Sequence, residues 1–106
     1  MSKQLWYQVR RCGYGESRMR TLLVLWDSAN KGEEAGLTLG ELTSRGGLAY
    51  AYVKKRIKLW VEWRFIKRVG TKMGNGSLRY LYSLASRGRK VIESLTPEEI
   101  RGLRNE

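Results

Sequence analysis

The pair Asn75-Gly76 lies between two runs in which apolar and basic residues alternate. Both residue types readily adopt the positive φ angles that the two-residue turn of a β-hairpin requires. Strands are therefore predicted at 65–69 and 78–82. Continuing the register of these strands would pair the charged Lys67 with the apolar Leu84. We therefore expect a bulge in the pairing or a longer loop. The predicted pairs are Met73 with Leu78, Thr71 with Tyr80 and Val69 with Tyr82 on an apolar face, and Lys72 with Arg79 and Arg68 with Ser83 on a cationic face.

Two helices are predicted near the start of the chain. The first covers 18–30, with Ser17 as a capping residue and apolar residues at three- and four-residue spacing. The second begins at Thr38, because a hydroxyl three residues before the carboxylate of Glu41 forms a reciprocal capping box. It ends at Gly46-Gly47, where glycine accepts the left-handed backbone conformation without steric cost.

A third helix is predicted over 49–64, followed by the hairpin and by further helices at 86–94 and from Thr96 onwards. Apolar spacing directs one edge of the third helix inward, and its members are Val53, Ile57, Trp60 and Val61. The predicted fold class is mainly α with a small β-hairpin, an α+β fold. We divide the chain into an N-terminal arm (1–17), one domain (18–95) and a C-terminal helical tail (96–106).

Positive charge is concentrated on the third helix and the hairpin. Residues 49–92 carry twelve basic side chains against the single acid Glu62, and this excess equals the net charge of the whole chain, +11. Such a cluster on ordered elements costs stability through repulsion unless a polyanion compensates it. Since the cations lie on regular structure, duplex DNA is the expected partner.

Several function classes lack the residues that they need. The chain has no histidine and a single cysteine, Cys12, and its one aspartate, Asp27, lies in an apolar helical pattern. We therefore expect no metal, no cofactor and no enzymatic activity. No window approaches 18 consecutive apolar residues and the start lacks a signal-peptide layout, so we expect a cytoplasmic, DNA-associated protein without a membrane segment.

Residues 18–95 resemble a known family of DNA-binding proteins. The stretch 41–48 (ELTSRGGL), followed by Val53, Ile57, Trp60 and Phe65-Ile66, is similar to the helix-turn-helix of MarR-type and PadR-type transcriptional regulators. The stretches 79–84 and 87–90 resemble the strand and the glycine-containing helix that close the wing in those families. Three positions depart from the pattern: Ala49 and Ala85 replace usual capping residues, with Ser86 expected to cap instead of Ala85, and Trp63 replaces a usual turn glycine.

The resemblance implies a winged helix-turn-helix with the helix 49–64 in the DNA major groove and the hairpin 65–84 as a wing on the adjacent backbone or minor groove. Helical rotation, with the inward edge facing the core, directs Glu62 outward and Tyr50 inward. The candidate DNA-facing residues are Ala51, Tyr52, Lys55 and Lys58 on the outer face, Lys54 and Arg56 on its flanks, and Lys72, Asn75 and Arg79 near the hairpin tip.

The predicted function is sequence-specific binding of double-stranded DNA by a homodimer that acts as a small transcriptional regulator or repressor. Trp6, Tyr7 and Tyr14 of the arm are candidate dimer contacts, with the helices at 18–30 and 86–104 as further dimer surfaces. Two alternatives remain open: a low-specificity architectural or partition-type protein that coats DNA, and a protein-interaction module with the same fold.

Overall fold

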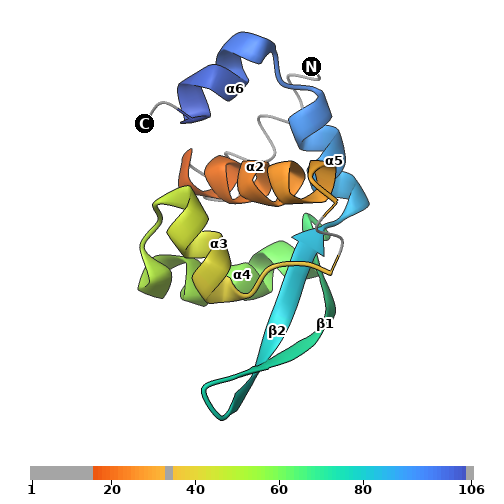
Figure 1. Cartoon of the computed structure of the whole chain (residues 1–106). Coiled ribbons are helices and arrows are strands. Elements are labelled where there is room, and N and C mark those ends of the chain that lie inside the picture. Colours follow the sequence, from red (N-terminus) through yellow and green to blue (C-terminus); the bar gives the residue numbers. More distant parts are fainter. Residues whose placement is uncertain (1–15, 33–34, 105–106) are drawn as a thin grey trace.

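The structure, a computed structural model, describes residues 16–32 and 35–104. Within these ranges it contains five helices and a two-stranded antiparallel sheet, and the sheet follows three of the helices (Figure 1). The predicted α+β class is therefore confirmed. The elements are α2 (Glu16–Asn30), α3 (Leu39–Gly46), α4 (Tyr50–Glu62), β1 (Ile66–Gly74), β2 (Ser77–Leu84), α5 (Ser86–Glu93) and α6 (Pro97–Arg104).

Helix α2 lies at the centre of the fold and packs against α3, α5, α6 and β2 (Figure 1). It begins before the predicted start at Arg18, so Ser17 lies inside the helix instead of capping it. Helix α6, which lies in the predicted C-terminal helical tail, packs on α2. It buries Leu103 in the same core and pairs Arg104 with Asp27 at 2.6 Å.

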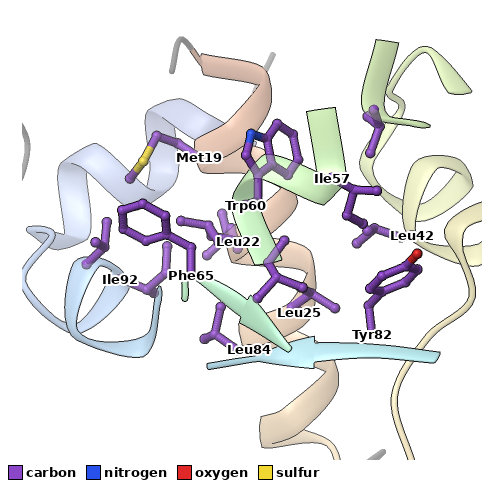
Figure 2. Close-up of a cluster of buried hydrophobic side chains, with 14 of the residues drawn as sticks. Met19, Leu22, Leu25, Leu42, Ile57, Trp60, Phe65, Tyr82, Leu84 and Ile92 are labelled. Atoms are coloured by element: carbon purple, nitrogen blue, oxygen red, sulfur yellow. The ribbon is translucent and has the colours of Figure 1, made fainter. Parts of the chain in front are cut away.

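The hydrophobic core joins α2, α4, the base of the hairpin and α5. Trp60 is fully buried at its centre (Figure 2). Val53, Ile57 and Trp60 of the predicted inward edge of α4 are buried, and Val61 is half-buried against the core. Burying a large apolar side chain contributes about 1.5–3 kcal/mol, so a domain of this size depends on each of them. The core includes Met19, Leu22, Leu25, Leu42, Val53, Ile57, Trp60, Phe65, Ile66, Tyr82, Leu84, Val91 and Ile92.

Helix α3 has both of its predicted end signals. The Thr38 hydroxyl accepts a hydrogen bond from the Glu41 amide at 3.2 Å, and the Glu41 carboxylate accepts one from the Thr38 amide at 3.0 Å. At the other end Gly47 adopts a left-handed conformation with φ 62°. By contrast, Ala49 and Ala85 begin α4 and α5 with no side-chain cap, and Ser86 does not replace the missing cap of α5.

Helix α4 ends at Glu62, before the predicted end at residue 64, and the turn that follows centres on Arg64. Arg64 has φ 63°, the left-handed region in which glycine is usual. Its amide donates to the carbonyl of Val61 at 3.0 Å, and the amide of Phe65 donates to the carbonyl of Trp60 at 2.9 Å. This is a Schellman ending, and it turns the chain from the helix directly into the hairpin.

The hairpin turns at Asn75 and Gly76, which have φ 50° and φ 81°, as the sequence predicted. The pairs of Met73 with Leu78, Thr71 with Tyr80 and Lys72 with Arg79 are confirmed. The expected bulge lies between Arg68 and Gly70, so the predicted pairs of Val69 with Tyr82 and of Arg68 with Ser83 are wrong. Val69 is the extra residue, and beyond it Arg68 pairs with Tyr82 and Lys67 with Ser83.

Two contacts attach the base of the hairpin to the body. Leu37 forms an isolated bridge with Tyr82, with N–O distances of 2.9 and 2.7 Å in the two directions. On the other side, Gly88 of α5 lies so close to the carbonyl oxygen of Phe65 that a β-carbon would clash with it. The base of the hairpin is therefore fixed between the Leu37 segment and α5.

The left-handed conformation of Arg64 generates a prediction about stability. A left-handed conformation costs an L-residue roughly 1–2 kcal/mol, and glycine avoids most of this cost. We expect Arg64→Gly to raise the free energy of unfolding by about 1 kcal/mol, measured by urea denaturation. The matched control Glu62→Gly, inside α4, should lower it by about 1 kcal/mol. A less stable Arg64→Gly variant would contradict this account.

The capping box of α3 generates a prediction about pH. The hydrogen bond from the Thr38 amide is the main cause that lowers the pKa of Glu41 below its ordinary value of 4.5. A carboxylate with a lowered folded-state pKa stabilises the protein above its unfolded pKa, and this contribution is lost as pH falls through the folded pKa. The stability advantage of the wild type over Glu41→Gln should therefore be largest near neutral pH and shrink below 4.5. Denaturation at a series of pH values measures this, and a constant difference would refute it.

Candidate nucleic-acid interface

The outer face of α4 is exposed and basic. Because Val53, Ile57 and Trp60 are buried, the opposite side of the helix faces solvent. Ala51, Lys54, Lys55 and Lys58 of the predicted DNA-facing set are exposed there, together with Glu62. Leu59, which the sequence reasoning missed, is also 38% exposed on this helix.

The two tyrosines of α4 are placed in the opposite way to the prediction. Tyr50 is 48% exposed, whereas Tyr52 is half-buried and packs against the core. The guanidinium of Arg56 lies 4.3 Å from the centre of the Tyr52 ring, a cation–π stack. Tyr52 and Arg56 thus form a pair on one flank of α4, and the predicted outward direction of Tyr52 is wrong.

A groove separates α4 from the hairpin, and two of the predicted DNA-facing cations line it. It has a volume of about 340 Å³ and is bounded by the start of α3, the first turn of α4 and strand β2. Lys54 enters it from α4 and Arg79 from β2, with Tyr50 and Tyr80 also on its walls. No acidic residue is among the residues that line it, so its positive charge is uncompensated by its own walls. We call this the α4–β2 groove.

The hairpin tip carries the remaining predicted residues. Lys72, Asn75 and Arg79 are all exposed. The charge of Lys72 adds to the Thr38 hydrogen bonds in lowering the pKa of Glu41, so Lys72 interacts favourably with this acid of α3. The apolar face of the tip, in contrast, is uncovered, with Met73 and Leu78 each 65% exposed.

A second basic pocket lies where α4, β1 and α5 meet. Its volume is about 570 Å³, and five of its lining residues are cations from the turn after α4, from β1 and from α5. Arg87 is partly structural, because it donates to the carbonyl of Trp63 at 3.1 Å and lies over the Phe65 ring. The cations are Arg64, Lys67, Arg68, Arg87 and Lys90.

The candidate dimer contacts Trp6, Tyr7 and Tyr14 lie outside the described residues. Of the other predicted dimer surfaces, α2 is covered by α3, α5, α6 and β2, whereas α5 and α6 each keep an exposed side.

Among residues 16–32 and 35–104 there is no helix with the length and apolar character that crossing a membrane requires. The same ranges hold no group of three or more metal-ligating side chains.

Comparison with known proteins found no match to this chain among protein-family models, curated proteins or solved structures. The geometry and charge of the α4–β2 groove, and of the surfaces beside it, are therefore what indicates a function.

Proposed function

We propose that this chain is a winged helix-turn-helix protein that binds duplex DNA and regulates transcription by occupying its site. The observation that carries the proposal is the α4–β2 groove, where Lys54 and Arg79 converge from two elements with no acid on the walls. The order of three helices followed by a hairpin supports the same proposal. In it α4 is the recognition helix and the hairpin is the wing.

The dimensions of α4 suit the major groove. An α-helix with its side chains is about 10–12 Å across, and the major groove of B-DNA is about 12 Å wide. The small side chain of Ala51 allows close approach of the helix backbone, while Lys55 and Lys58 extend from the same exposed face. These residues would lie against base edges and phosphates.

The α4–β2 groove would receive the sugar–phosphate backbone that separates the major groove from the minor groove. Lys54 and Arg79 would each contact phosphate, and such contacts supply most of the affinity of a basic protein for DNA. The hairpin would then continue into the minor groove, with Lys72 and Asn75 near its end.

A homodimer would place two α4 helices about 34 Å apart, one turn of DNA. Since α2 is covered, the exposed sides of α5 and α6 are the described surfaces available for this contact, with the arm as a further candidate. We retain the dimer as part of the proposal, and sedimentation of the protein with and without DNA tests it.

A second candidate function is low-specificity coating of DNA. The chemistry of α4 favours it, because the exposed cations of its outer face are lysines, whereas Arg56 is stacked on Tyr52. Lysine binds phosphate as a point charge and reads guanine less selectively than the bidentate guanidinium of arginine. A regulator with this face would need other sources of sequence preference.

The groove assignment is tested with Lys54→Ala combined with Arg79→Ala. Loss of two phosphate contacts should weaken DNA binding about tenfold or more and reduce the slope of log affinity against log salt by about 2. Fluorescence anisotropy between about 50 and 200 mM salt measures both. The matched control, Lys31→Ala with Arg101→Ala, removes the same charge from two exposed positions, one in the turn after α2 and one on α6, and should change affinity far less. Equal losses of DNA affinity in the two variants would reject the groove as a DNA contact. A wild-type affinity that does not change with salt would favour a protein partner.

Specificity separates the two DNA-binding functions. Duplexes selected from a random pool should be bound at least about 10³ times more tightly than bulk DNA if the protein is a regulator. A competition assay at physiological salt measures this ratio. A ratio near ten would favour the coating function instead.

A further inference from the structure

An apolar stripe runs along one face of the hairpin from the core to the tip. It begins at Tyr82, which is 6% exposed, continues through Tyr80 at 52%, and ends at Leu78 and Met73 at 65% each. Met73 and Leu78 are directly opposite each other, next to the residues that flank the turn. We call these two residues the tip pair. Figure 1 shows that this end of the hairpin projects away from the helices.

The stripe is held in a defined position as far as Tyr80. The Tyr80 ring meets the buried Tyr82 ring edge-on at 6.5 Å, and the guanidinium of Arg68 lies 4.5 Å from the centre of the Tyr80 ring. The tip pair lies beyond these contacts, on a strand pair whose base is anchored by Leu37. The protein thus presents two large apolar side chains at the end of a stalk that is fixed at its base.

The other face of the tip carries like charges in the same position along the hairpin. Lys72 and Arg79 are directly opposite each other, an arrangement that is unfavourable in an isolated sheet. Exposed apolar groups and paired cations both cost free energy in the unbound protein, and Glu41 offsets part of this cost at Lys72. A ligand that removes both costs must offer anionic groups beside an apolar surface.

Duplex DNA has both features, since its phosphates border the sugars and stacked bases of the minor groove. A second copy of this chain does not fit, because it would bring another net charge of +11 to a cationic tip. The width of the minor groove also limits how a hairpin can enter it. This groove is about 6 Å wide, and the backbones of two paired strands are already about 4.8 Å apart without their side chains, so the hairpin is wider than the groove. A hairpin can enter only where the groove is opened, and inserted apolar side chains open it by unstacking a base step.

We propose that the tip pair, Met73 and Leu78, is an apolar wedge that enters the minor groove and bends the duplex, with Lys72 and Arg79 on the flanking phosphates. This inference rests on the proposed DNA-binding function and adds to it a mode of recognition. Sequence preference would then come in part from base steps that unstack easily, such as TA and CA.

The test compares Met73→Ser/Leu78→Ser with Met73→Leu/Leu78→Met, which exchanges the two residues and so keeps the apolar volume. Both positions are exposed, so both variants should keep the thermal melt of the wild type. Energy transfer between dyes at the two ends of a duplex measures the bend at saturating protein. We expect the wild type and the exchange variant to bend DNA within the range of about 20–90°, and the serine variant to bind more weakly and lose the bend.

Failure of the wedge is distinguishable from failure of the proposed function. If the wild type binds a duplex without bending it, or if the serine variant bends it equally, the wedge is wrong while DNA binding stands. A serine variant that changes only the oligomeric state would also overturn the wedge and assign the stripe to a protein contact. If the wild type binds no duplex at all, both proposals are rejected.

Discussion

The direction in which the hairpin leaves the helices depends on one turn, the left-handed ending of α4 at Arg64. It brings the amide of Phe65 to the carbonyl of Trp60, two residues that are 1% and 0% exposed. Because both side chains are buried on either side of the turn, the core itself fixes the angle between α4 and β1. Gly88 reinforces this, since its missing β-carbon lets α5 lie directly on the Phe65 carbonyl. The α4–β2 groove exists because this angle is set.

A hairpin of two strands is at best marginally stable alone, and the described residues that bury its side chains lie near its base. The bridge of Leu37 to Tyr82 adds a short third segment there, and Ile66 and Leu84 are buried beside it. Beyond the bulge at Val69 the strands leave the body, and their side chains are mostly exposed. The same hairpin therefore combines a fixed base, which places Arg79 on the wall of the groove that Lys54 also lines, with a tip whose surface is available for contact.

Local signals account for what could be predicted from the sequence. The capping box of Thr38 and Glu41 and the turn at Asn75-Gly76 each act within a few residues, so sequence alone located them. The predicted directions of Tyr50 and Tyr52 were wrong because helical rotation defines only the outer face of α4. It does not show which of the two flanks of the helix is covered by neighbouring elements. The position of the bulge and the left-handed Arg64 depend on tertiary packing of Phe65 and Tyr82, which short-range patterns do not contain. For the same reason the sequence showed an apolar hairpin face without showing that its tip is uncovered.

Arginine and lysine are distributed unequally over this structure, and the difference bears on recognition. Arg18 lies 4.3 Å from the centre of the buried Trp60 ring, and Arg56, Arg68 and Arg87 also lie over aromatic rings. A planar guanidinium suits such stacking, whereas the compact, strongly hydrated ammonium of lysine favours solvent. The packing thus places several arginines on aromatic rings and leaves lysines on the outer face of α4. On the proposed function, that face supplies affinity through charge more than base selection through paired hydrogen bonds. Preference for a DNA sequence would then depend on how easily the duplex deforms around the hairpin, and an apolar tip that enters the minor groove would favour the sequences that deform most easily.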